Sequence, residues 1–130
     1  MTPQPSTPAP STPASSTPER PAFVMLNGQI VPFAEARISI MAPGLTFAAT
    51  VFEGMRAYWN EGDGQLYVFR LQDHLRRQDF SMKLIELDKP PSAEETDQQV
   101  LETLRANGLR EDCYIRKTMA PDPTLQRVGS

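Results

Sequence analysis

The chain has 130 residues, which is enough for one domain of ordinary size. Thirteen Lys and Arg against 16 Asp and Glu give a net charge of −3, so the chain lacks the basic excess with which nucleic-acid-binding proteins hold a phosphate backbone. A single cysteine and a single histidine exclude an internal disulfide and leave a multi-thiolate zinc site without ligands, so we expect no metal.

No targeting or membrane segment is apparent. No apolar run approaches the ~18 residues that span a bilayer, and the N-terminus lacks the basic and apolar regions of a secretory signal. We therefore expect a cytoplasmic protein that contacts neither a membrane nor nucleic acid.

The first 21 residues differ from the rest in composition. Seven of the 13 prolines fall within residues 1–21, among Ser, Thr and Ala. Such a segment cannot bury enough apolar area to offset the cost of ordering its backbone, so we predict a disordered tail over residues 1–21. One folded domain is predicted over residues 22–119, followed by a truncated linker or tail over residues 120–130.

Strand signals dominate the first half of this domain. Asn27-Gly28 lies between two apolar runs, residues 23–26 and 29–31, and is typical of a type I′ hairpin turn. Pro43-Gly44 indicates a turn. Residues 50–59 read as a longer strand that returns over residues 66–69. The glycine within it, Gly54, indicates a bulge or a place where a ligand or another backbone comes close.

Helical periodicity follows. Apolar residues recur every three or four positions from Leu71 to about Leu87. Ser92 and Glu95 form a capping-box pattern at the start of a second helix, and Asn107-Gly108 closes it. Residues 113–119 form a last strand. The predicted fold is α/β (α+β), with two helices on one side of a mostly antiparallel sheet.

Three segments carry a resemblance to a known family. They are residues 51–58 (VFEGMRAY), residues 69–77 (FRLQDHLRR) and residues 114–116 (YIR). From about Phe23 to Lys117 the chain resembles the small N-terminal domain of the branched-chain-amino-acid aminotransferases, which are class IV (fold-type IV) pyridoxal-phosphate-dependent enzymes. The FEG-x-R-x-Y strand is the most discriminating segment. Two sister families usually differ there and stay open as alternatives, the D-amino-acid aminotransferases and the aminodeoxychorismate lyases.

The resemblance implies pyridoxal 5′-phosphate as the cofactor of the complete enzyme and Arg77 as a ligand of its phosphate. A planar guanidinium suits this role, because it can hold two phosphate oxygens and stays charged at any working pH. The alternative is a solvated helix-face arginine, which is how Arg76 reads.

The resemblance also assigns residues to the substrate. Phe52, Gly54 and Tyr114 match a pocket for an aliphatic side chain, which only an apolar wall of fitting shape can select. Arg116 matches the arginine that receives the distal carboxylate of glutamate or 2-oxoglutarate. Phe47 stands where the family often has a tyrosine, and the missing hydroxyl would shift the preference away from acidic partners.

Arg56 is two residues after Gly54 and therefore on the same strand face, which makes it a supporting substrate residue. Its alternative is a surface strand arginine paired with Glu53 or Glu61.

Transamination needs a lysine that forms a Schiff base with the cofactor. In the family this lysine belongs to the second, larger domain. No motif makes Lys83, Lys89 or Lys117 catalytic, so we expect no catalytic residue in this chain and no turnover by it alone.

The predicted function is therefore transamination of leucine, isoleucine and valine with 2-oxoglutarate, with this chain as a truncated or split form of the enzyme. Its expected partners are an amino acid, a 2-oxo acid, and either a second copy in a homodimer or a missing second domain. Two alternatives remain: a non-catalytic domain that dimerises with an intact relative, and a degraded gene product that barely folds.

Overall fold

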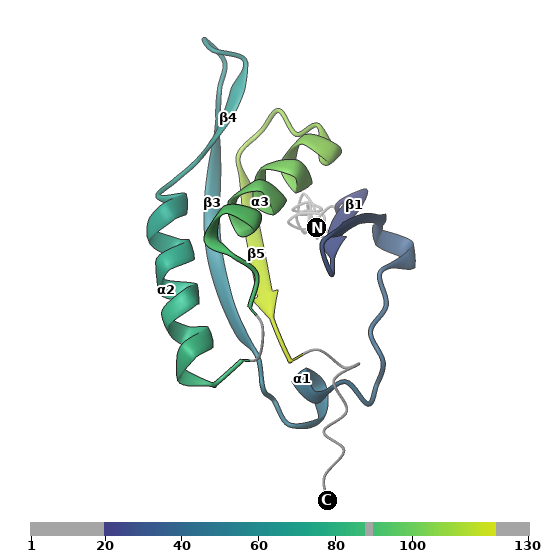
Figure 1. The fold of residues 1–130 in the computed structure, drawn as a ribbon. Coiled ribbons are helices and arrows are strands. Elements are labelled where there is room, and N and C mark those ends of the chain that lie inside the picture. Colours follow the sequence, from purple (N-terminus) through teal and green to yellow (C-terminus); the bar gives the residue numbers. More distant parts are fainter. Residues whose placement is uncertain (1–19, 88–89, 122–130) are drawn as a thin grey trace, which may run out of the picture.

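A computed structural model describes residues 20–87 and 90–121 of the chain, so the predicted tail over 1–21 and the segment 120–130 lie almost wholly outside the described residues. The elements follow one another in chain order (Figure 1): β1 (Phe23–Leu26), β2 (Gln29–Pro32), a 3-10 turn (Phe33–Glu35), α1 (Pro43–Thr46), β3 (Val51–Asn60), β4 (Gln65–Val68), α2 (Leu71–Leu84), α3 (Ala93–Asn107) and β5 (Cys113–Met119). The mixed α and β composition with antiparallel strands was predicted correctly.

The strands form two sheets rather than the single expected one. β1 pairs only with β2, whereas β3 lies between β4 and β5 in a three-stranded antiparallel sheet. The predicted hairpin turn is confirmed, with Asn27 and Gly28 both at positive φ. The hairpin is held by α3 instead of by the larger sheet. Asn107 at the end of α3 accepts from the backbone N–H of Phe23 at 3.1 Å and donates to its carbonyl at 2.9 Å.

β3 is the central strand and organises the rest of the domain. It pairs with β5 from Val51 to Ala57 and with β4 only from Ala57 to Asn60. Its register with β5 is unbroken at Gly54, so this glycine forms no bulge. The odd-numbered side chains Glu53, Met55 and Ala57 are buried. They lie on the face that α2 covers (Figure 1).

α2 and α3 complete the core, which consists of Met55 and Ala57 from β3, Leu75 and Met82 from α2, and Val100 from α3. α2 ends at Leu84, three residues before the expected end, because Glu86 turns the chain to a φ of 52°. For α3 both predicted signals are confirmed. The capping box between Ser92 and Glu95 forms at its start, and Gly108 ends it at a φ of 58°.

α1 lies where the sequence indicated a turn. Pro43 occupies a first-turn position, where its missing N–H costs nothing, so Pro43-Gly44 starts a short helix. Gly44 lies against the end of the larger sheet, because a Cβ there would come 2.8 Å from the Cβ of Ala120. Within the described residues, no helix is long and apolar enough to cross a membrane.

Candidate functional site

The even-numbered residues of β3 form one exposed face with the residues that pair with them on β5. Gly54 lies opposite Arg116, and Arg56 lies opposite Tyr114. Directly paired residues point to the same side of a sheet. The structure thus brings five of the predicted substrate residues onto one face, which we call the open face: Phe52, Gly54, Arg56, Tyr114 and Arg116.

Two contacts join four of these five residues in pairs. The guanidinium carbon of Arg116 lies 4.4 Å from the centre of the Phe52 ring, a distance at which a cation is attracted to an aromatic face. The ring of Tyr114 lies over Gly54, where a Cβ would come 3.1 Å from Cζ and Cε2 of the tyrosine. The space that Gly54 leaves is therefore filled by Tyr114. Phe52 and Tyr114 remain 55% and 60% exposed, as expected of an uncovered wall.

Arg56 does not pair with Glu53, which was one of its alternatives. Its guanidinium carbon lies 5.9 Å from the centre of the Tyr58 ring, on the open face. Glu53 is on the opposite face of the same strand, because successive residues of a strand alternate in direction.

Phe47 lies apart from the open face. It is the C-cap of α1, four residues before β3 begins, and is 76% exposed. Its place in a substrate pocket stays a prediction.

Arg77 also lies apart, on α2 and therefore on the covered side of the sheet. Its Nε donates to Oε1 of Glu53 at 2.8 Å, and one terminal nitrogen, Nη2, donates to Oε2 at 2.6 Å. His74, one turn earlier on α2, has its Nδ1 2.9 Å from the same Oε2. A carboxylate can only accept, so Nδ1 of His74 carries the hydrogen.

The electrostatics of this cluster follow from its geometry. Glu53 is only 3% exposed, and a buried carboxylate needs opposite charge and hydrogen bonds to stay ionised. The hydrogen bonds from Arg77 are the main cause that lowers the pKa of Glu53; burial opposes them, and the smaller effect of His74 adds to that of Arg77, so that the pKa is lowered overall. The pKa of Arg77 is raised by the same contact.

A broad, open depression of about 340 Å³ lies beside this cluster, lined by Phe69, Arg70, Asp73, His74 and Arg77. The side chain of Arg77 is 65% exposed there. Among the described residues, its Nη1 has no hydrogen-bond partner, so this nitrogen can receive an anion. The residues present therefore fit a phosphate group at Arg77. Arg70 adds positive charge at the rim, although it is paired with Asp73 at 2.7 Å.

The two lysines that the structure describes, Lys83 and Lys117, lie away from the open face. Lys117 belongs to the covered side, where its Nζ donates to Oε1 of the buried Gln78 at 2.8 Å. Burial lowers its pKa to about 8. Lys83 is exposed and pairs with Asp79 at 2.7 Å, and Lys89 lies outside the described residues.

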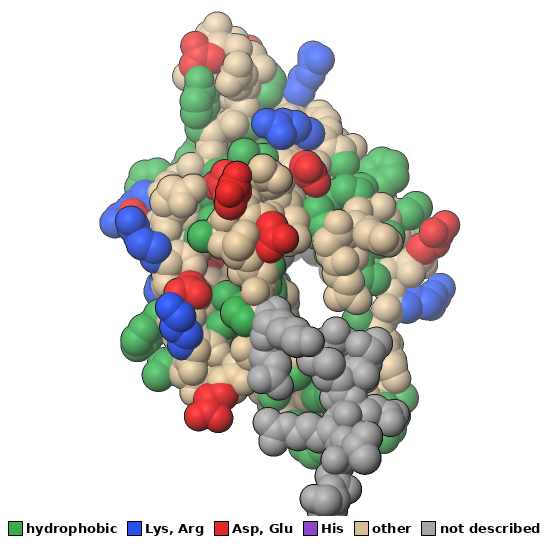
Figure 2. Space-filling model, in the orientation of Figure 1, with side chains coloured by type: hydrophobic (Ala, Val, Ile, Leu, Met, Phe, Trp, Pro, Cys, Tyr) green, Lys and Arg blue, Asp and Glu red, His purple; other side chains and the backbone are tan. Residues whose placement is uncertain are grey.

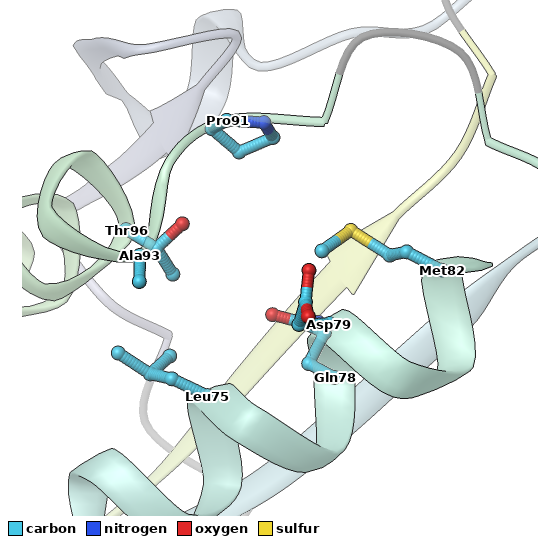
Figure 3. A pocket seen from close by; sticks show the side chains of 7 residues that line it. All are labelled: Leu75, Gln78, Asp79, Met82, Pro91, Ala93 and Thr96. Carbon is cyan, nitrogen blue, oxygen red and sulfur yellow. The ribbon is translucent and has the colours of Figure 1, made fainter.

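A second hollow lies between α2 and the start of α3 (Figure 3), lined by Leu75, Gln78, Asp79, Met82, Pro91, Ala93 and Thr96. Its volume of about 30 Å³ holds about a water molecule or two and no substrate. Figure 2 views the molecule from this helix side, where basic and acidic side chains are interspersed along α2. Across residues 20–87 and 90–121, no group of three or more His, Cys, Asp or Glu is placed to hold a metal ion.

Glu53 and His74 were part of the recognised motifs but received no role from the sequence. Strand alternation alone separates Glu53 from Arg56 and directs it to the helix side. The spacing of His74 and Arg77 by three residues puts both on one face of α2. These two signals indicate which way each side chain faces, but not that Glu53 and Arg77 meet, because that depends on how α2 packs on β3.

No family model matches the chain. The similar proteins and solved structures described next are all named as branched-chain aminotransferases. A probable branched-chain-amino-acid aminotransferase of Aquifex aeolicus is 40% identical over 94 residues, which are 72% of this chain and 30% of that protein. The crystal structure of the branched-chain aminotransferase of Thermoproteus uzoniensis with norvaline matches with a TM-score of 0.72 and 44% identity over 85% of this chain and 37% of that one.

The branched-chain amino acid aminotransferase of Thermobaculum terrenum in its PLP form matches with a TM-score of 0.69 and 38% identity, over 75% of this chain and 32% of that one. The chain thus spans about a third of the length of these relatives. The sequence and fold comparisons thus point to the same kind of protein. The chain is therefore similar to the branched-chain-amino-acid aminotransferases over about a third of their length, and its fold matches their small N-terminal domain.

Proposed function

We propose that this domain supplies the cofactor-phosphate ligand and one wall of the substrate site in the pyridoxal-phosphate-dependent transamination of branched-chain amino acids with 2-oxoglutarate. The observation that carries the proposal is the gathering of five family-matched substrate residues on the open face. The relatives from T. terrenum, in its PLP form, and from T. uzoniensis, with norvaline, support the choice of cofactor and substrate class.

In this proposal Arg77 holds the phosphate of the cofactor through its outward nitrogen. When bound, pyridoxal phosphate supplies the electron sink that makes the α-proton of the amino acid removable. Of the lysines that the structure describes, Lys117 is engaged with the buried Gln78 and Lys83 is paired with Asp79, so the proposal takes the lysine that moves this proton from the larger domain of the complete enzyme.

The open face accounts for one site that accepts both apolar and acidic side chains. The Phe52 and Tyr114 rings offer apolar contact to a leucine side chain, which has no hydrogen-bonding group to recognise. Arg116 donates to the distal carboxylate when glutamate occupies the same place. The guanidinium of Arg116 lies over the Phe52 ring, 4.4 Å from its centre. The positive charge is therefore held against the open face and leaves space for the substrate side chain.

A ligand must reach around β3 to contact both Arg77 and the open face. β4 pairs with β3 from Ala57 onward, and the N–H of Phe69 donates to the carbonyl of Arg56, so between Val51 and Met55 the β4 side of β3 has no strand partner among the described residues. This unpaired edge is the route that joins the two sides in the proposed site.

A chimera tests the proposal. Residues 23–117 of this chain replace the matching segment of the A. aeolicus relative, and glutamate formation from leucine and 2-oxoglutarate is measured with added cofactor. We expect activity. In the chimera, Phe52→Ala should raise the KM for leucine, and Arg77→Met should raise the concentration of pyridoxal phosphate needed for half-maximal activity. Asp79→Asn, which removes the carboxylate that pairs with Lys83 on α2, is the matched control.

The same chimera separates the alternatives. Activity on D-alanine in place of leucine would favour a D-amino-acid aminotransferase, and release of pyruvate from aminodeoxychorismate would favour a lyase. A chimera that is folded by circular dichroism and inactive on all three substrates contradicts the proposal.

One observation favours a second candidate, a domain that acts by association with another copy or with an intact relative. Three large apolar side chains between β2 and β3 are highly exposed, Ile38 at 69%, Ile40 at 80% and Met41 at 74%. Contiguous exposed apolar side chains mark protein contact sites. Light scattering on the full chain tests this candidate: a dimer that dissociates on Ile40→Glu supports it, and a monomer counts against it.

A further inference from the structure

Glu53 is an unusual residue for its position. It lies on β3 beneath α2, 3% exposed, with the fully buried Met55 and Ala57 following it on the same face of the strand. An ionised carboxylate in such surroundings is costly unless it is paired and hydrogen-bonded. A neutral side chain of similar size would pack there without this cost, so the charge calls for an explanation.

Both partners of Glu53 come from α2, and both line the open depression. Arg77 binds the two carboxylate oxygens through Nε and Nη2, and His74 contacts Oε2 through Nδ1. A bidentate contact fixes the plane of a guanidinium as well as its distance. The other edge of the guanidinium carries Nη1 and makes no contact with Glu53. It is therefore turned away from β3, at the rim of the depression.

Without Glu53, Arg77 would be a long side chain on an exposed helix face, 65% exposed and free to rotate about several bonds. A ligand that binds such a side chain has to order it first, which weakens binding. A side chain that is already fixed in the required orientation avoids this loss.

We infer that Glu53 is a positioning residue, which holds Arg77 from the covered face of β3 so that its free edge meets the phosphate of the cofactor. The inference rests on the proposed function of Arg77. His74 stabilises the same carboxylate and thereby supports the arrangement.

The direction in which one substitution changes the affinity for an anion distinguishes a positioning role of Glu53 from a simple effect of its charge. Glu53→Gln removes a negative charge close to Arg77, so Coulomb attraction alone predicts tighter anion binding. Positioning predicts the reverse, because an amide has one acceptor oxygen and cannot hold the guanidinium at two points. Asp73→Asn is the matched control, since it removes a negative charge from the rim of the same depression without a contact to Arg77.

The experiment uses the full 130-residue chain and inorganic phosphate as the probe. Phosphate is titrated while the Nε–H resonance of Arg77 is followed by ¹⁵N NMR, and the solvent exchange rate of this hydrogen is measured without phosphate. For the wild-type chain we expect slow exchange and saturable binding. We expect Glu53→Gln to speed the exchange and weaken phosphate binding about tenfold, and Asp73→Asn to leave the exchange slow and strengthen binding.

Glu53→Asp serves as a second variant in case the amide destabilises the fold. It keeps the charge but is one methylene shorter, and we expect phosphate affinity between those of the wild type and Glu53→Gln. Unchanged or tighter binding by a folded Glu53→Gln variant overturns the inference while the role of Arg77 stands. Absence of phosphate binding by the wild-type chain instead contradicts the proposed function of Arg77, and the inference fails with it.

Discussion

The ring of Tyr114 occupies the space in which a side chain at Gly54 would begin. A Cβ on Gly54 would lie 3.1 Å from both Cζ and Cε2 of the tyrosine, closer than most real Cβ contacts. The glycine thus permits a cross-strand aromatic side chain to lie flat on the sheet.

This relationship gives the first prediction. Gly54→Ala should destabilise the chain by up to about 1 kcal/mol, because the added methyl forces the exposed Tyr114 ring out of its place. Urea unfolding checks the value. Adding Tyr114→Ala should remove most of the loss, since the clash then has no partner. Equal losses from Gly54→Ala with and without Tyr114 would show that the ring is not the cause.

Asn107 provides the second prediction, at the contact between the hairpin and α3. Asn107→Ala removes the pair of hydrogen bonds to the backbone of Phe23 and should cost about 1–2 kcal/mol. Hydrogen exchange of the β1 and β2 amides should speed up while β3 stays protected. Asn107→Asp keeps the acceptor and loses the donor, and its effect should be intermediate. Uniformly faster exchange of all strands would contradict a local role.

The pKa of Glu53 gives the third prediction. Because this pKa is lowered in the folded chain, chiefly by the hydrogen bonds from Arg77, the unfolded chain binds the proton at a higher pH. The stabilisation is therefore complete above the ordinary glutamate pKa of 4.5 and is lost as the pH falls through the folded-state pKa.

Unfolding free energies of the wild type and of Glu53→Gln check this from pH 7 to pH 3. The advantage of the wild type should be constant above about pH 5 and shrink below it. Asp73, whose pKa is also lowered, is present in both chains, so its effect cancels in the difference. A difference that does not change with pH would contradict the ion pair.

Lys117 provides the fourth prediction. Burial lowers its pKa to about 8, and only the neutral amine attacks an acylating reagent. The rate of acetylation at Lys117, followed by peptide mass spectrometry, should rise with pH and level off above about pH 8. Lys83 in the same digest corrects for changes in the reagent. A rate at Lys117 that keeps rising tenfold per pH unit up to pH 10 would contradict the lowered pKa.

Features that depend on neighbouring residues were predictable from the sequence. The Asn27-Gly28 turn, the Ser92 cap and the span of β5 all follow from short-range stereochemistry, and the structure confirms them. The end of α2 was missed because no proline or glycine follows directly and the left-handed residue is Glu86.

Features that depend on packing were harder to predict. The division into two sheets depends on Asn107, which joins α3 to a strand 84 positions earlier, and no local pattern specifies that contact. The open face was predictable from strand alternation once the family motif had been recognised. The pairing of Glu53 with Arg77 spans 24 positions and depends on how α2 lies against β3, so the sequence left Glu53 as a possible partner of the wrong arginine.

The alternation along β3 has a consequence for how such a domain can evolve. Odd positions of the strand maintain the interior, and even positions meet whatever lies on the open face, so the two sets can mutate almost independently. Random libraries restricted to residues 52, 56 and 58 should therefore yield mostly folded variants with altered ligand preference. Libraries at residues 53, 55 and 57 should yield mostly unfolded ones. Within one strand of ten residues, one set of positions therefore determines the fold and the other determines the ligand preference.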